Sequence, residues 1–176
     1  MPTLGEFVRS RGWEVGEGYI AGRQGSSGDA AHLAGKPLLA TTALSTAGID
    51  PAGISVVPSG PIIRPRTAAR FTPPLLLVKE HEDLPHALWE KDFLAYKHEI
   101  LGISAPKADT PALRAVDEWL DQESLALRAY VASTSPRLFN QRATAILFDD
   151  ILALPYTPDA GLDLSDNEQI VVEDVV

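Results

Sequence analysis

Prolines and glycines interrupt this sequence so often between residues 37 and 74 that neither a long helix nor a long strand fits there. The apolar stretches left between them, such as residues 54–57 and 62–63, are two to four residues long. Proline cannot donate a backbone hydrogen bond within a sheet, and both residue types favour turns. The segment therefore predicts short strands with irregular connections.

Compact apolar runs on either side of this segment predict buried strands. Leu75–Val78 directly follows a double proline, and the glycine-flanked run Gly18–Gly22 is typical of a strand that opens into a loop at residues 23–28. Further candidate strands lie at residues 93–96, 100–103 and 145–148. We expect a sheet core to be built from these runs.

One long helix is predicted near residues 111–132. Pro111 occupies the first helical position, and one face of the helix then carries Leu113, Val116, Leu120, Leu127 and Val131. Residues 3–9 favour a shorter helical turn. Together these patterns predict an α/β or α+β domain with a short-stranded, irregular sheet and one long helix.

The domain is expected to span residues 1–158, followed by an acidic tail at residues 159–176. A chain of 176 residues suits one domain with its tails. The tail holds six acids and no base, and Ser165 with Glu168 forms a capping-box pattern ahead of Ile170. Because the sequence ends just after this helix would begin, we expect a chain cut from a longer polypeptide.

The composition limits the cellular compartments and the kinds of chemistry to be expected of this chain. The chain has no cysteine, which excludes disulfides, thiolate zinc sites and cysteine nucleophiles. No apolar run approaches the ~20 residues that cross a bilayer, and residues 1–11 lack the pattern of a signal peptide. We expect a soluble, cytoplasmic protein with no membrane partner.

Charge is distributed unevenly along the chain. The net charge is −9, but residues 1–80 carry 8 basic and 6 acidic side chains, whereas residues 81–176 carry 7 and 18. Residues 51–79 hold no acid at all, and their four cations are Arg64, Arg66, Arg70 and Lys79. This stretch is a candidate phosphate-facing surface. That its cations are solvated, or paired with the acidic second half, is an equally open interpretation of the sequence.

The sequence holds no complete catalytic motif. Residues 28–36 resemble a phosphate loop, but the glycine spacing is too long and Pro37 stands where Ser or Thr would hold magnesium. The histidines of residues 81–86 are five positions apart with Pro85 between them, so no helix can present them as a pair of zinc ligands. No Gly-x-Ser-x-Gly elbow marks a nucleophilic serine.

The tetrapeptide Thr72–Leu75 has the two central prolines of the Asn-Pro-Pro-aromatic motif with which amino-group methyltransferases act on an extruded base. Thr72 lacks the amide or carboxylate oxygen that accepts from the target amine, and Leu75 lacks the ring that stacks on the base. We therefore expect this tetrapeptide to lead into a buried strand. No catalytic, cofactor-binding or metal-binding residue is predicted in the chain.

Five segments in a fixed order carry a resemblance to a known family. They are Gly16–Gly22, Phe71–Lys79, Ile100–Ile103, the helix Pro111–Ser133 and Ala145–Pro155. Their order is similar to the glycine-rich opening, the F-x-x-P-x-L-L-I-K strand, the Gly-Ile step, the long helix and the closing D-I-x-x-L-P segment in the C-terminal region of N-6 adenine DNA methyltransferases. Those enzymes belong to restriction-modification and related defence systems. The match covers most of the chain.

The resemblance implies a DNA target-recognition domain that is not catalytic by itself. Its parent would be an adenine-specific methyltransferase whose separate N-terminal domain binds S-adenosylmethionine. Double-stranded DNA and that N-terminal methyltransferase domain are therefore the expected partners, and no cofactor is expected in this chain.

A DNA-facing domain needs phosphate contacts and base-reading side chains. Besides the four cations of residues 51–79, the candidate phosphate contacts are Arg9, Arg11 and Arg23, and the candidate base readers are Gln24, Ser26, Ser27, Gln141 and Arg142. The alternative function is a protein-interaction or scaffolding module of a defence or multi-subunit complex. In that case the acidic second half would bind a partner subunit or the catalytic domain, and DNA would not be touched. An enzyme with an unrecognised site is a third, more distant alternative.

Overall fold

A computed structural model describes residues 2–22, 30–136, 146–158, 161–162, 165–167 and 169–170 of the chain. The α-helices are α1 (Leu4–Ser10), α2 (Thr110–Gln122), α3 (Ser124–Thr134) and α4 (Phe148–Leu152). The strands are β1 (Glu14–Glu17), β2 (Ile20–Ala21), β3 (Pro37–Leu39), β4 (Leu44–Ser45), β5 (Gly48–Ile49), β6 (Ile54–Val56), β7 (Ile62–Arg64), β8 (Leu75–Lys79), β9 (His86–Trp89) and β10 (Ile100–Ser104). Short 3-10 helices, among them η4 (Ala68–Phe71), connect these elements.

The central sheet has four antiparallel strands in the order β1-β10-β8-β9. The two inner strands, β8 and β10, are buried along almost their whole length, as their apolar sequences require. Because side chains alternate across a strand, Leu76 and Val78 enter one core cluster, while Leu75 and Leu77 enter another. The sheet therefore separates two cores, and β1 is one of its two outer strands.

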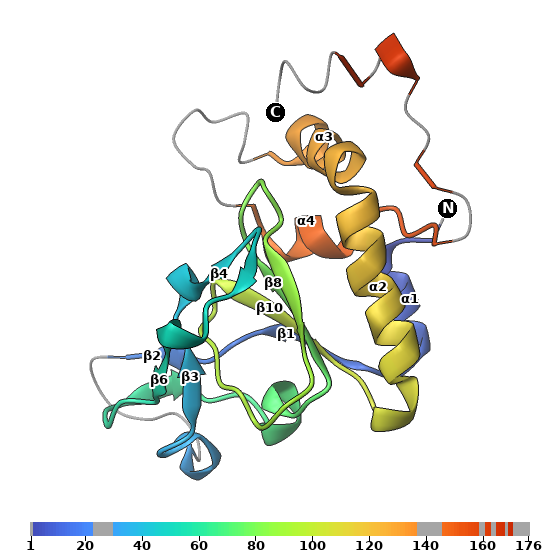
Figure 1. The fold of residues 1–176 in the computed structure, drawn as a ribbon. Coiled ribbons are helices and arrows are strands. Elements are labelled where there is room, and N and C mark those ends of the chain that lie inside the picture. Colours follow the sequence, from blue (N-terminus) through green and yellow to red (C-terminus); the bar gives the residue numbers. More distant parts are fainter. Residues whose placement is uncertain are drawn as a thin grey trace.

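The α-helices lie on one side of this sheet (Figure 1). Leu113, Val116 and Leu120 of α2 pack into the core that contains Leu76 and Val78. Helices α1 and α4 contact each other, and α1 also contacts β1. None of the described helices has the length and apolar character needed to span a membrane. The helical layer thus fixes the start of α4 beside the outer strand β1.

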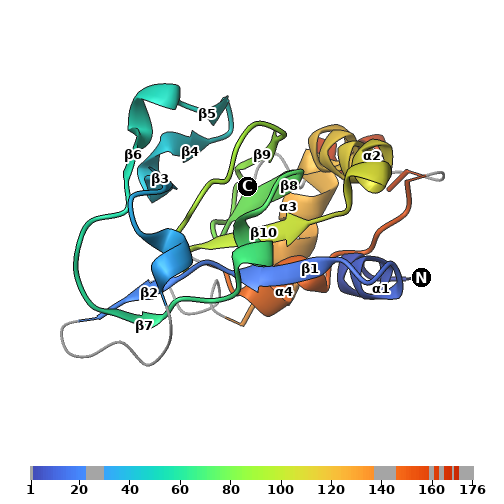
Figure 2. The same cartoon turned by 90° about the horizontal axis from the view of Figure 1, so that it is seen from below.

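Three two-stranded antiparallel sheets, β2 with β7, β3 with β6 and β4 with β5, extend to the other side of the central sheet (Figure 2). Their buried side chains, among them Leu39, Leu44 and Ile62, share the second core with Phe71 and Tyr96. The strands are two or three residues long, as the frequent prolines and glycines predict. The short-stranded, irregular α+β architecture is confirmed.

The predicted helix over residues 111–132 is confirmed, but the structure divides it at Glu123 into α2 and α3. Glu123 has φ −97° and ψ 11°, outside the ordinary helical values. The residues on either side of the break, 121–124, are all polar, so the apolar face is interrupted there. The change of direction lets Leu127 reach the same core as Leu120.

The strand predicted at residues 145–148 is wrong for its described part. Phe148 begins α4, and the two residues before it are not in a strand. The Asp150 carboxylate accepts a hydrogen bond from the backbone N–H of Leu147 at 2.9 Å. This contact satisfies a free donor at the helix start, so local capping favours a short helix over strand pairing.

The strand predicted at residues 93–96 is an irregular buried segment. Leu94, Ala95 and Tyr96 are fully buried, but the structure pairs Ala95 with Leu38 through an isolated bridge. The apolar run therefore predicted the burial of this segment correctly, but the predicted strand pairing is wrong. In a short apolar run, a buried irregular segment and a buried strand have the same sequence pattern.

Part of the predicted acidic tail packs against the domain. Leu162 lies against the helical core, and its N–H donates a hydrogen bond to the Glu123 carboxylate at 2.9 Å. A helical turn follows, in which the N–H of Gln169 donates to the carbonyl of Ser165 at 2.9 Å. The predicted capping residue Glu168 lies outside the described residues.

Candidate nucleic-acid interface

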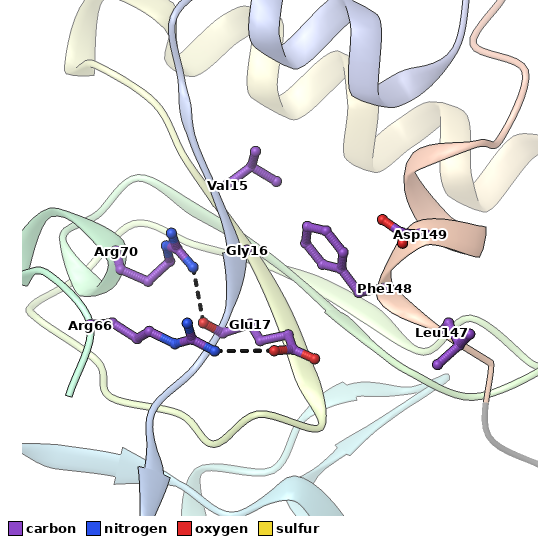
Figure 3. A pocket seen from close by; sticks show the side chains of 8 residues that line it. All are labelled: Val15, Gly16, Glu17, Arg66, Arg70, Leu147, Phe148 and Asp149. Atoms are coloured by element: carbon purple, nitrogen blue, oxygen red, sulfur yellow. Dashed lines mark hydrogen bonds and ion pairs between the residues drawn. The ribbon is translucent and has the colours of Figure 1, made fainter. Parts of the chain in front are cut away.

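A cleft of about 360 Å³ lies along the outer edge of β1 (Figure 3). The chain before and within η4 supplies two arginines on one side, and the start of α4 forms the other side. The lining residues are Val15, Gly16, Glu17, Arg66, Arg70, Leu147, Phe148 and Asp149. Segments from the beginning, the middle and the end of the described chain thus meet at one place.

The outer edge of β1 turns backbone groups toward this cleft. In an antiparallel pair, residues alternate between those bonded to the neighbouring strand and those directed away from it. The N–H of Gly18 bonds to Ile100 of the neighbouring chain segment at 3.2 Å, so Val15 and Glu17 belong to the outward set. The carbonyl of Glu17 indeed accepts a hydrogen bond from Arg70 Nη1 at 3.0 Å on the outer side.

Arg70 is held firmly on this edge. Its Nε and Nη2 donate to Glu14 Oε1 at 3.0 and 2.7 Å, in addition to the bond to the Glu17 carbonyl. A side chain on Gly16 would overlap the Arg70 guanidinium, so the glycine makes room for it. The backbone carbonyl of Arg70 accepts a hydrogen bond from the buried Tyr96 hydroxyl at 2.8 Å, and burial raises the pKa of Tyr96, so this hydroxyl remains a donor.

Arg66 occupies an unusual backbone conformation beside the cleft. Its φ is 63°, a left-handed value that non-glycine residues rarely adopt. Two contacts fix the side chain: Nε donates to the Gly18 carbonyl and Nη2 to Glu17 Oε2, both at 3.1 Å. Strained backbone persists only where the surroundings stabilise it, and such strain is concentrated at functional sites.

The opposite wall is positioned by Asp150. Its carboxylate accepts from the hydroxyl of Ser135, next to the end of α3, at 2.7 Å and from the N–H of Leu147 at 2.9 Å. These two bonds tie the start of α4 to the helical layer. Phe148 packs partly against the helical core and leaves the rest of its ring facing the cleft (Figure 3). The Asp149 side chain is exposed beside it.

The structure places the predicted phosphate contacts in different settings. Arg66 and Arg70 come together at the cleft, each paired with a glutamate. Arg11 lies near Asp109, with 3.9 Å between Nη1 and Oδ1, and its guanidinium stacks over the Phe7 ring. No carboxylate of the described residues lies within ion-pair distance of the other three predicted cations in the described chain, which are Arg9 on α1, Arg64 on β7 and Lys79 on β8.

The predicted base readers lie outside the described residues. They are Gln24, Ser26, Ser27, Gln141 and Arg142, and the predicted phosphate contact Arg23 also lies outside them. Their segments rejoin the described chain at Gly22 and at Ile146, and Ile146 directly precedes the cleft residue Leu147.

A second polar cluster connects β9 to α2 and α3 around a cavity of about 330 Å³. His86 Nε2 lies 3.2 Å from Asp121 Oδ1, and Arg128 Nη2 lies 2.8 Å from Asp83 Oδ1. Burial raises the pKa of the neighbouring Asp117, an effect that His86 opposes. These pairs join the sheet to the helices. In the part of the chain that the structure describes, no group of three or more His, Cys, Asp or Glu side chains is arranged to hold a metal ion.

Sequence reasoning missed Glu14, Glu17 and Phe148. The glutamates lie about 50 residues before the arginines they bind, and pairs at such separations leave no periodic signal. Phe148 was assigned to a strand, so its place at the helix start was not foreseen. The one usable signal was Gly16, since a glycine within a strand often marks the close approach of another group.

The search for known relatives found no match: neither a family model nor a curated protein matches the sequence.

Proposed function

We propose that this chain is the DNA sequence-recognition module of an S-adenosylmethionine-dependent N-6 adenine DNA methyltransferase and is not catalytic by itself. One observation carries the proposal. The segments on which the resemblance rests, the glycine-rich opening at Gly16 and the closing segment at Leu147–Asp149, line the same cleft although they are more than 100 residues apart. A shared site is the expected result if these segments were retained for recognition.

The surroundings of the cleft support contact with a duplex. Arg64 is exposed on β7 and pairs in register with Ile20, three residues beyond the cleft residue Glu17. A cation with no carboxylate partner in the described chain is available to a phosphate. Arg66 and Arg70 are already neutralised by glutamates, so they contribute less to attraction of the phosphate backbone than the sequence alone predicts.

The catalytic steps are assigned to another domain. We propose that an N-terminal methyltransferase domain of the parent protein binds S-adenosylmethionine and the target adenine, in the cytoplasm where the DNA substrate lies. In this arrangement the cleft chooses the site, and the partner domain performs the transfer.

The proposal is tested by selection from a library of random DNA duplexes with the purified chain at low salt. We expect a short sequence motif to be enriched over successive rounds. Binding of the enriched duplex, followed by fluorescence anisotropy, should weaken as salt rises. The absence of both binding and enrichment would refute DNA recognition and leave a protein-interaction module as the better explanation.

A pair of alanine variants locates the phosphate contact. Arg64→Ala should weaken binding to all duplexes alike and flatten the slope of log affinity against log salt by about 0.9, the effect of one lost counterion-releasing contact. Arg114→Ala is the matched control, because it removes one arginine from α2, where Arg114 pairs with Glu90. Equal slopes for the two variants would show that Arg64 does not face the backbone.

A further inference from the structure

The cleft along β1 has no excess of positive charge. Arg66 and Arg70 contribute two cations, while Glu17 and Asp149 line the same cleft and Glu14 binds Arg70. A phosphate entering the cleft would meet at least as many carboxylates as guanidinium groups, and like charges at this range repel. The charge of the cleft therefore disfavours a phosphate and favours an uncharged group.

The cleft instead offers hydrogen-bond donors and acceptors side by side. Arg66 has five N–H donors, of which the described contacts use two. The outward N–H and carbonyl of Val15 add one donor and one acceptor along the strand edge. The carboxylates of Glu17 and Asp149 add acceptors. Such an array suits a planar group that shows an amine beside an acceptor, as the edge of adenine does in the major groove.

An apolar wall completes the cleft. The partly exposed ring of Phe148 faces Gly16 and the arginines across it, and Leu147, 38% exposed, lies beside the ring (Figure 3). Aromatic rings and guanidinium planes both favour contact with the flat faces of bases. The volume of about 360 Å³ also falls in the usual range of sites for small organic groups.

We infer that this cleft receives the edge of an amino-bearing nucleobase, with Asp149 accepting from the amine, Arg66 donating to the neighbouring acceptor and Phe148 forming the wall. The inference rests on the proposed function and assigns base reading to the cleft, with phosphate contact left to cations outside it. A peptide strand is a poorer occupant, because Arg70 already caps the outward carbonyl of Glu17 that strand pairing would use.

The variant Asp149→Asn distinguishes a cleft that binds a base from one that binds a phosphate, because the two cases predict different changes in DNA affinity. If the cleft reads a base, the variant should lose discrimination at one position of the selected motif, by about 5- to 150-fold, the range of a good base contact. Its affinity for random duplex should equal that of Glu118→Gln, which removes one negative charge from an exposed carboxylate on α2. If the cleft takes a phosphate, Asp149→Asn should bind every duplex more tightly than the control.

A second variant and a cross-linking experiment test the same inference without relying on the folding of Asp149→Asn. Phe148→Leu retains an apolar side chain against the core and removes the ring, so it should also relax preference at that position. A motif duplex with 5-iodouracil beside that position should cross-link to the peptide that contains Phe148 on irradiation. An unchanged motif in both variants, or a uniform gain in affinity for Asp149→Asn, would overturn the inference while duplex binding itself persists. If the unmodified chain binds no duplex at all, the proposed function itself would be overturned.

Discussion

Replacing Arg70 tests whether the basic stretch is part of the framework of the cleft. Its side chain is 15% exposed and makes two charge-assisted bonds to Glu14, whose side chain is 38% exposed. Such bonds contribute about 1.5–3 kcal/mol each when buried, but both share one oxygen and Glu14 is partly solvated, so a coupling of about 1–2 kcal/mol is the discounted expectation. With the bond to the Glu17 carbonyl, Arg70→Ala should destabilise the fold by about 2–4 kcal/mol.

The coupling is measured by a double-mutant cycle with Arg70→Ala, Glu14→Gln and both together, using urea unfolding followed by circular dichroism. Arg64→Ala is the matched control, and as an exposed arginine it should change the free energy of unfolding by less than about 0.5 kcal/mol. The thermal midpoint of Arg70→Ala should fall by roughly 4–16 °C for a chain of this length. Equal losses for Arg70→Ala and Arg64→Ala, with no coupling to Glu14, would refute the structural role.

Three further substitutions test the packing and the charges around the sheet. Gly102→Ala should cost about 1–3 kcal/mol in denaturant unfolding, because a methyl group there overlaps both the hydroxyl and the adjoining ring carbon of the buried Tyr96; an unchanged free energy of unfolding would contradict this close packing. Asp117→Asn should stabilise the protein by less than about 1 kcal/mol above neutral pH, where burial penalises the charged carboxylate of Asp117. This gain should vanish as the pH falls through the raised pKa of Asp117 and the carboxyl protonates, so a constant gain across pH would contradict the reasoning. Trp13→Phe should cost about 1–3 kcal/mol by removing the 2.7 Å bond from Nε1 to Asp109, whereas the thermal midpoint should hardly move if that bond is unimportant.

The elements with a distinct sequence pattern were predictable. Leu75–Val78 and Ile100–Ile103 form the inner strands because only continuous apolar runs suit strands buried on both faces. The helical stretch that begins at Pro111 was visible from its spacing, but its division at Glu123 depends on how two faces reach one core, which spacing does not encode. The helix at Phe148 was missed because its capping residue, Asp150, follows the apolar run instead of preceding it.

The cleft was less predictable than the fold. The sequence indicated an acid-free basic stretch and left open whether its four cations face phosphate or are solvated or paired with the acidic second half. Arg66 and Arg70 instead bind glutamates that are far away in the sequence. Antiparallel pairing of β1 with β10 brings those glutamates to the sheet edge that η4 approaches. Such pairings follow from topology, so a local charge count cannot distinguish a framework arginine from one that is available to a ligand.

Under the proposed function, the paired arginines would give an acidic chain specific DNA recognition with little general affinity for DNA. A recognition module with many free cations would bind all duplexes tightly and gain specificity only from small differences. When guanidinium groups are neutralised by nearby carboxylates, the uniform attraction falls while their N–H groups remain fixed in direction. Glu17 orients the Arg66 guanidinium by accepting a hydrogen bond from Nη2, and other N–H donors of Arg66 are left for a ligand. Under the proposed function, base-edge contacts would then account for a larger share of the total binding free energy, and a partner domain on the same DNA would supply the affinity that is given up.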